Sequence, residues 1–148
     1  MDNVRFVVAG WGDMGPRVID MVVRMGLGRK VVFTGFLRGK EVERAYRMAD
    51  VYVMPSVSEP FGLTALEALQ QGTPVIVSKT AGVSEVVRNV LRVAFGDVDD
   101  LASKILSILA FPPLRATLAA RGLAETRGLS WREAAARCRD VYAELVGQ

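Results

Sequence analysis

The sequence predicts an α/β fold of the Rossmann-like class, in which helices cover both faces of a parallel sheet. Five apolar runs have the length and the valine content of strands, and helical patterns separate them. Apolar residues in these runs are continuous rather than alternating, which is typical of parallel strands buried on both faces. The runs are Val4–Ala9, Val31–Thr34, Val51–Met54, Val75–Ser78 and Val90–Ala94. We expect a single domain over residues 1–148, a length that can hold a true core.

The helices between the strands are predicted from apolar periodicity and from their end signals. Pro16 suits the first turn of a helix because it lacks an N–H, and an apolar face then runs to Gly26. A second helix is expected over Lys40–Asp50, with an apolar face formed by Val42, Ala45, Tyr46 and Ala49. A third should begin within Phe61–Thr64 and end at Gly72, just before the fourth strand.

Three further helices are expected in succession after the last strand. Asp97 can cap the first of them, and Pro112-Pro113 separates it from a second helix over Leu114–Glu125. Ser130 and Glu133 have the spacing of a capping box and should open the last helix. The chain therefore ends in an all-helical segment that follows the sheet.

The composition excludes several kinds of site. The 19 Lys and Arg residues exceed the 16 Asp and Glu residues, but they are scattered along the chain, so nucleic-acid binding is not indicated. There is no histidine and one cysteine, so the chain can form neither an internal disulfide nor a Cys/His metal site, and we expect no metal. The cysteine, Cys138, lies with Trp131 on the apolar side of the last helix, and both are predicted core residues.

We expect a cytoplasmic protein that is part of a longer chain. No apolar run reaches the length of a membrane span, and the N-terminus lacks the basic and apolar regions of a signal peptide. The first strand follows Met1-Asp2-Asn3 at once, as it would in a fragment cut at a domain boundary.

The most informative run begins at Pro55, directly after the third strand, and predicts a tight loop followed by a helix start. The first turn of a helix has unpaired N–H groups and a partial positive charge, so its backbone could hold a phosphate. Glu59 in the loop and Glu67 in the second helical turn could accept hydrogen bonds from the hydroxyls of a sugar-bearing ligand. The backbone donors would come from Phe61, Gly62, Leu63 and Thr64.

Simpler interpretations remain open for these residues. Glu59 could be an ordinary solvated turn residue, and Glu67 a helix acid beside an apolar stripe. The whole string is more specific than either acid, because Pro, Gly and Thr stand where a strand-loop-helix anion site requires them. Four residues after the fourth strand could also face a ligand or simply shape a turn, since ligands of open α/β sheets bind at this edge. They are Lys79, Thr80, Gly82 and Glu85, of which Gly82 could allow a close approach of the backbone.

A competing hypothesis is a dinucleotide site. Gly10, Gly12 and Gly15 spell the glycine fingerprint between a strand and a helix. An NAD-type domain would also need an acid about 20 residues further on, at the end of the next strand, to hold the ribose. Thr34-Gly35-Phe36 occupy that place and carry no carboxylate. The glycines could equally form a tight turn without a ligand.

The motifs together resemble one family along nearly the whole chain. They include Gly10-x-Gly12, Ala49-Asp50-Val51-Tyr52-Val53-Met54-Pro55-Ser56, Glu59-Pro60-Phe61-Gly62-Leu63, Glu67-Ala68, Gly72-x-Pro74-Val75-Ile76, Gly82-Val83-x-Glu85 and Ser130-Trp131. On these residues the chain resembles the C-terminal, nucleotide-sugar-binding half of a retaining GT-B glycosyltransferase. The resemblance is to family 4, the large group that includes bacterial and archaeal glycogen synthases.

The resemblance implies a role for each site residue. Glu59 would contact donor-sugar hydroxyls near the reacting carbon, and Glu67 the ribose hydroxyls. Backbone N–H groups of Phe61–Thr64 would bind the diphosphate, main chain near Leu37 the base, and Gly12 would also line the donor site. The donor would be a UDP-, ADP- or GDP-sugar, and neither a metal nor a cofactor would be required.

The resemblance also implies a missing partner. Family members have an acceptor-binding N-terminal half, and an Arg and a Lys that neutralise the diphosphate in a βα unit upstream of the first strand seen here. Because the sequence contains neither, we expect the chain to bind its donor weakly and to catalyse no transfer without its N-terminal half.

Overall fold

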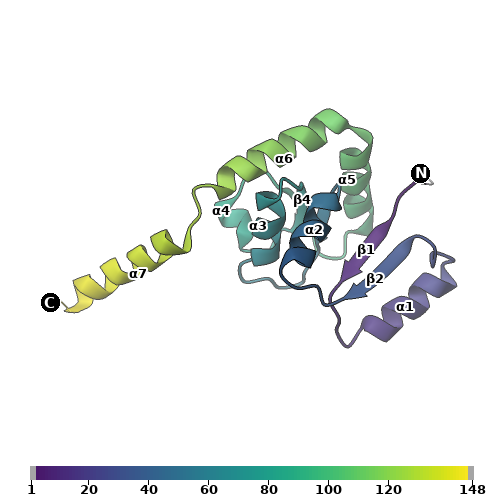
Figure 1. Cartoon of the computed structure of the whole chain (residues 1–148), viewed down its shortest axis with the longest axis horizontal. Coiled ribbons are helices and arrows are strands. Elements are labelled where there is room, and N and C mark those ends of the chain that lie inside the picture. The colour runs from purple at the N-terminus through teal and green to yellow at the C-terminus, as the bar shows by residue number, and fades with distance from the viewer. Residues whose placement is uncertain (1–2, 147–148) are drawn as a thin grey trace. The chain divides into compact units, whose positions relative to one another are not determined.

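The computed structural model describes residues 3–146, in which five strands and seven helices are found. The chain forms two compact units, Met1–Val42 and Glu43–Gln148, which can be followed by colour in Figure 1. Every pairing between strands is parallel, as predicted. The strands lie in two sheets, β1-β2 and β3-β4-β5. The α/β class with parallel sheets is confirmed, while the single domain over residues 1–148 stays a prediction.

The N-terminal unit is built on one parallel strand pair. β1 (Phe6–Ala9) pairs with β2 (Val31–Gly35), and α1 (Gly15–Arg24) connects them. A bulge interrupts the register between Val8 and Ala9. Pro16 lies in the first turn of α1, as predicted, because its missing N–H would have had no helical partner there.

The C-terminal unit contains the larger sheet and most of the helices. Its strands are β3 (Tyr52–Met54), β4 (Val75–Ser78) and β5 (Leu91–Val93). Its helices are α3 (Leu63–Gln70), α4 (Val83–Val86), α5 (Val98–Ala110), α6 (Pro112–Thr126) and α7 (Trp131–Val146), while α2 (Lys40–Met48) runs across the boundary between the units. All five predicted strands and the helices between them are therefore present.

The core of the C-terminal unit surrounds its central strand. All four residues of β4 are buried, which explains the uninterrupted apolar character of its sequence. Ile76 packs in a cluster with Val93, Ile108 and Leu118, so β4, β5, α5 and α6 share one core. The sheet that carries the loops described below is thus firmly packed.

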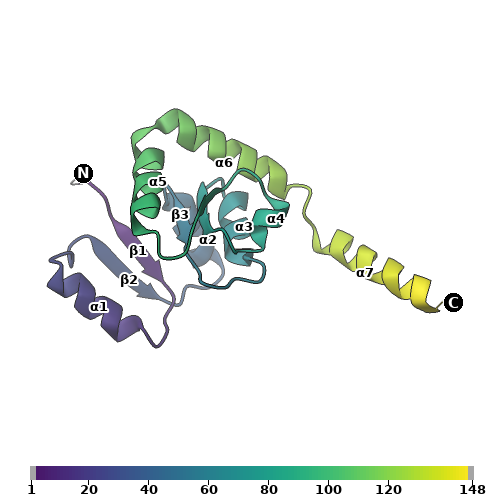
Figure 2. The same ribbon diagram turned by 180° about the vertical axis from the view of Figure 1, so that it is seen from behind.

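Helices α3 and α6 lie side by side, as both views of the molecule show (Figures 1 and 2). Gly122 makes this approach possible. A Cβ atom at position 122 would lie 2.5 Å from Cδ2 of Leu69, which is fully buried on α3. The glycine in the middle of α6 therefore has a packing role.

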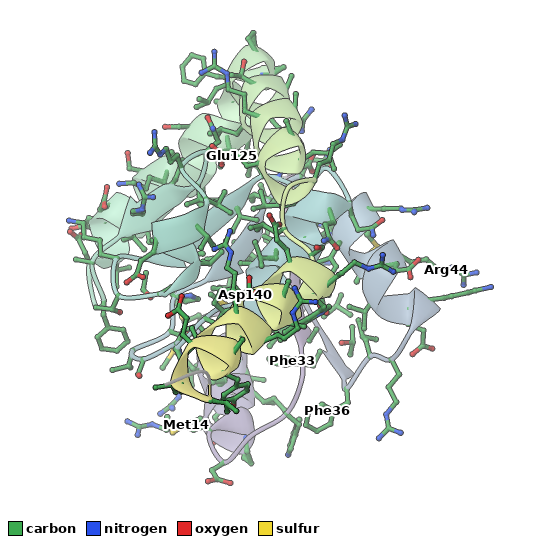
Figure 3. The ribbon with its side chains drawn as sticks, turned by 90° about the vertical axis from the view of Figure 1, so that its left-hand side faces the viewer. Met14, Phe33, Phe36, Arg44, Glu125 and Asp140 are labelled. Carbon is green, nitrogen blue, oxygen red and sulfur yellow. The ribbon has the colours of Figure 1, made fainter. Side chains whose placement is uncertain are left out.

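Glu125 on α6 forms hydrogen bonds with the turn that precedes β5. The Glu125 side chain is labelled in Figure 3. Its carboxylate accepts hydrogen bonds from the backbone N–H groups of Arg88 and Asn89, at 2.8 and 3.1 Å, and from the Asn89 amide at 2.6 Å. Burial alone would raise the pKa of Glu125, but the hydrogen bonds from Asn89 and Arg88 outweigh it and the pKa is lowered.

Three predictions about the C-terminal helices need comment. Asp97 caps α5 by accepting a hydrogen bond from the Asp100 N–H at 3.0 Å, as predicted. Two separate helices meet at Pro112-Pro113, as predicted, but α6 begins at Pro112 rather than at Leu114, because the first turn of a helix needs no N–H donor. Ser130 caps α7 by accepting from the Glu133 N–H at 3.1 Å, which is one half of the expected capping box.

The prediction that Trp131 and Cys138 are core residues is wrong for this structure. Trp131 is 77% exposed and the Cys138 thiol is exposed. None of the residues of α7 is buried. The apolar periodicity correctly predicted the helix, but periodicity alone does not show what its apolar side packs against.

Among residues 3–146, no single helix is long and apolar enough to cross a membrane. α5 and α6 satisfy the length and composition test only as a pair, and they meet at a bend of 99°.

Candidate functional site

The predicted strand-loop-helix site is present in the C-terminal unit. β3 ends at Met54 and α3 begins at Leu63, so residues 55–62 form the connecting loop. Glu59 lies in this loop, and Glu67 is the fifth residue of α3, in its second turn. Both acids therefore occupy the positions expected from the sequence, one on each side of the helix start.

Gly62 is the N-cap residue of α3, and it has no side chain that could accept hydrogen bonds from the first N–H groups of the helix. It lies in the left-handed region at φ 100° and ψ 51°, and it caps α3 without a side chain. Its carbonyl oxygen accepts hydrogen bonds from the N–H groups of Ala65 and Leu66, at 3.1 and 3.3 Å. Within the described residues, no acceptor contacts the N–H groups of Leu63 and Thr64. These two donors remain available at the positive end of α3.

Glu59 is half-buried and bends back toward the helix start. Its Oε1 accepts a long hydrogen bond from the Phe61 N–H at 3.4 Å. Its main-chain carbonyl accepts from the Gly82 N–H at 3.1 Å. In this state the Glu59 carboxylate itself covers one of the predicted anion-binding donors, that of Phe61. The weak geometry means that a ligand can replace it at small cost.

The segment that follows β4, residues 79–82, contacts the loop that carries Glu59. Thr80 donates its hydroxyl hydrogen to the Val57 carbonyl, with 3.2 Å between the oxygens. At Gly82 an added Cβ would lie 2.1 Å from the Pro60 carbonyl oxygen, so only glycine allows this approach. Gly82 was predicted as a position of close backbone approach, and the structure shows that it closes on the protein's own loop. Lys79 and Glu85 are exposed, and Glu85 stands in the first turn of α4.

Thr64 contributes to the site through its main chain. Its hydroxyl oxygen accepts a hydrogen bond from the Tyr52 hydroxyl at 3.0 Å and donates to the Met54 sulfur at 3.4 Å. Both hydrogen bonds of the hydroxyl are therefore made to other residues of the protein. Its backbone N–H is the group left for an anion.

Glu67 is exposed but tethered at one oxygen. Its Oε2 accepts a long hydrogen bond from the hydroxyl of Tyr46 at 3.3 Å, and Tyr46 is only 8% exposed. The Tyr46 ring meets the ring of Tyr52 edge to face, with 5.3 Å between the ring centroids and 88° between the planes. Glu67 and Thr64, three residues apart on one helix face, are thus each bonded to a tyrosine hydroxyl.

Burial and neighbouring charges both change the pKa values of Tyr46 and Tyr52. Burial raises the pKa of Tyr46 well above its ordinary value of 10.0, and the neighbouring Tyr52 and Glu67 raise it further. Burial also raises the pKa of Tyr52; the Thr64 hydrogen bond opposes this, while the charges of Glu67 and Glu59 add to it. Both carboxylates therefore lie close enough to Tyr52 to raise its pKa.

Sequence reasoning missed Tyr46 and Tyr52 as site residues. Tyr46 was counted in the apolar face of its helix and Tyr52 in a strand, and both assignments are correct as far as they go. The available signal was chemical: a buried tyrosine hydroxyl needs a hydrogen-bond partner, although the sequence does not identify that partner.

Gly12 and Leu37 belong to the N-terminal unit, so the site built here consists of residues of the C-terminal unit alone. Gly12 is exposed and its carbonyl accepts from the Gly15 N–H at 2.8 Å; Leu37 is half-buried. Gly10, at φ 101°, donates its N–H to the Gly35 carbonyl at 2.7 Å. One donor of the glycine turn is thus used by the end of β2, where a dinucleotide domain would instead carry an acid.

The chemistry available at the helix start is anion binding beside hydroxyl binding. Unpaired N–H groups and a helix dipole favour a phosphate, and two flanking carboxylates can accept hydrogen bonds from sugar hydroxyls. Within residues 3–146, no three His, Cys, Asp or Glu residues gather as a metal-binding group.

Comparison with known proteins identifies related sequences and structures. The family described as glycosyl transferases group 1 matches residues 1–124. A glycosyltransferase of Methanocaldococcus jannaschii, itself uncharacterised, is 46% identical over 87 residues, which cover 59% of this chain and 22% of that protein.

Two solved structures show the same fold. Sucrose-phosphate synthase of Thermosynechococcus elongatus superposes with a TM-score of 0.83 and 33% identity, over 95% of this chain and 38% of that one. The Anabaena protein HepE, solved in complex with UDP-glucose, gives a TM-score of 0.78 and 25% identity, over 85% of this chain and 36% of that one. The chain thus spans less than two fifths of each of these relatives.

Proposed function

Because this chain belongs to the group 1 glycosyltransferases, which have the GT-B fold, we propose that it forms the part of such an enzyme that binds the nucleoside-diphosphate sugar. One observation carries the proposal. The N–H groups of Leu63 and Thr64 have no acceptor among the described residues and lie between the acids Glu59 and Glu67. The diphosphate would bind these donors, Glu67 the ribose hydroxyls and Glu59 the donor sugar.

The proposed reaction is a sugar transfer with retention of configuration. The bond between the anomeric carbon and the diphosphate oxygen breaks, and a bond to the acceptor hydroxyl oxygen forms on the same face of the sugar. The acceptor proton passes to the leaving diphosphate. Negative charge grows on that diphosphate in the transition state, so the fixed N–H dipoles of α3 stabilise the transition state more than the ground state.

The full-length protein would supply what this chain does not. The chain spans less than two fifths of the three relatives named above, so we assign transfer to the whole enzyme and weak donor binding to this chain, with its N-terminal acceptor-binding half as partner. UDP is the first nucleotide to test, since HepE was solved with UDP-glucose, and ADP and GDP follow. A cytoplasmic location and a reaction without metal or cofactor stay predictions.

Calorimetric titration tests the proposal. This chain and the full-length enzyme would be titrated with UDP, ADP, GDP and NAD. We expect a nucleoside diphosphate to bind. Glu67→Ala should raise its Kd by about tenfold or more, because a carboxylate that accepts hydrogen bonds from a ligand contributes about 1.5–3 kcal/mol to the binding free energy. Glu144→Ala, which removes an exposed acid on α7, is the matched control.

The variant Glu59→Ala distinguishes the role proposed for Glu59 from that proposed for Glu67. We expect it to leave nucleoside-diphosphate binding almost unchanged while transfer by the full-length enzyme is abolished, because Glu59 is assigned to the sugar and not to the nucleotide. Equal loss of binding in the Glu59 and Glu67 variants would contradict this division of roles. Binding of NAD alone would instead support a dinucleotide site at the glycine turn of the N-terminal unit.

A further inference from the structure

Two tyrosine hydroxyls stand directly behind the exposed face of α3. Tyr46 comes from α2 and Tyr52 from β3, and their rings contact each other edge to face. Their hydroxyls donate to Glu67 and Thr64, which lie on one face of α3. These contacts join the first two turns of the helix to a rigid aromatic pair.

We propose that Tyr46 is a positioning residue that sets the carboxylate of Glu67 for the ribose hydroxyls of the donor nucleotide. This inference rests on the proposed function, in which Glu67 binds the ribose. Tyr46 is buried and has no assigned contact with the ligand, so it acts through Glu67 alone.

The first step of the argument is the difference in freedom between the two side chains. An exposed glutamate samples many rotamers, and ordering it on binding costs free energy. Tyr46 is fixed by its surroundings: it is buried against the Tyr52 ring, and its main-chain carbonyl accepts from the buried Thr73 hydroxyl at 2.7 Å. A fixed donor next to one oxygen of Glu67, even through a long hydrogen bond of 3.3 Å, biases the carboxylate toward one orientation before the ligand arrives.

The second step is the number of acceptor sites that remain. A carboxylate offers about four lone-pair positions on its two oxygens. The Tyr46 hydroxyl uses one of them, on Oε2. Oε1 and the second position on Oε2 stay open, which suits two neighbouring hydroxyls such as those of a ribose.

The third step is the protonation of the donor. Burial raises the pKa of Tyr46, so its hydroxyl keeps its proton at neutral pH. It therefore remains a hydrogen-bond donor to Glu67 at neutral pH. Tyr52 has a different effect, because it bonds to the Thr64 side chain while the group left for an anion is the Thr64 N–H.

The test compares Tyr46→Phe with two matched tyrosine variants. Phenylalanine keeps the ring contact with Tyr52 and removes only the hydroxyl. Tyr52→Phe removes the hydroxyl bonded to Thr64, and Tyr142→Phe removes a hydroxyl on α7 that is 68% exposed. Each variant would be titrated with UDP and with 2′,3′-dideoxy-UDP, or with the corresponding pair for ADP or GDP if that nucleotide binds best.

We expect Tyr46→Phe to raise the Kd for the ribose nucleotide by about threefold to tenfold, the effect of one hydrogen bond to a charged group weakened by exposure. Its Kd for the dideoxy nucleotide should not change. Tyr52→Phe should alter both values by the same factor, and Tyr142→Phe neither. In the Glu67→Ala background, Tyr46→Phe should have no further effect, because the residues act as one unit.

Equal weakening of both nucleotides by Tyr46→Phe, or additive effects of Tyr46→Phe and Glu67→Ala, would overturn the inference. The proposed function would survive that result as long as Glu67→Ala still weakens UDP. If Glu67→Ala binds UDP like the unaltered chain, the proposed function itself fails. A crystal structure with UDP gives a second test that needs no variant: the inference fails if Glu67 binds the ribose after leaving the Tyr46 hydroxyl.

Discussion

Replacing Gly82 by alanine tests whether the segment after β4 positions Glu59. Gly82 has ordinary helical angles, φ −59° and ψ −27°, so alanine causes no backbone strain of its own. The added Cβ, however, would lie 2.1 Å from the Pro60 carbonyl oxygen and 3.0 Å from its carbonyl carbon. Because both atoms belong to the main chain, the loop must move by about 1 Å to restore van der Waals contact.

The expected cost follows from that displacement. Overpacking costs about 1–3 kcal/mol, and the hydrogen bond from the Gly82 N–H to the Glu59 carbonyl, if lost, adds about 1 kcal/mol. We expect the free energy of unfolding to fall by about 2–4 kcal/mol and Tm by about 4–16 °C. Transfer by the full-length enzyme should fall about 100-fold, since a 1 Å misplacement of a catalytic group has effects of that order.

Thermal unfolding followed by circular dichroism, together with the transfer rate, would measure both effects. Gly128→Ala is the matched control, because its Cβ would meet nothing closer than the Glu125 carbonyl oxygen at 4.0 Å. If Gly82→Ala matched the control in Tm and in transfer rate, the loop would not depend on this contact, and the support assigned to the segment after β4 would be refuted.

Two further predictions concern the helix start and the turn before β5. Gly62→Val should lower the free energy of unfolding by at least about 2 kcal/mol and weaken nucleoside-diphosphate binding. A branched residue would be strained at φ 100°, and its Cβ would lie 3.1–3.2 Å from Met54 and Val83. Normal affinity in calorimetry would argue against the site. Glu125 has a lowered pKa in the folded protein, so its stabilising effect is present above its ordinary pKa of 4.5 and is lost as the pH falls through the folded value. Glu125→Gln should therefore flatten the fall of the urea midpoint as the pH drops below 4.5, and an unchanged acid limb would show that the carboxylate does not stabilise the turn.

The sequence predicted the elements well because their signals are local. The strand runs are apolar without interruption, and end signals such as Pro16 and Asp97 depend on one or two neighbouring residues. The positions of Glu59 in a loop and Glu67 in a helix followed from the proline and glycine between them. Local backbone chemistry was sufficient for each of these.

What the sequence did not predict depends on contacts between distant residues. The bond from Tyr46 to Glu67 joins positions 21 residues apart, and the contact of Thr80 with Val57 joins positions 23 apart. Gly82 could be recognised as a place of close approach, but not as an approach to Pro60. The exposure of Trp131 shows the same limit, because the periodicity of a helix does not reveal its neighbour.

The contacts of Thr80 and Gly82 with the Glu59 loop also bear on protein engineering. The loop keeps its shape because two main-chain carbonyls, those of Val57 and Glu59, are held by a segment that follows the next strand. A designer who moves residues 55–67 alone into another α/β scaffold would transfer the acids without their support. Residues 78–82 would have to be transplanted with them, on a neighbouring parallel strand in the same register.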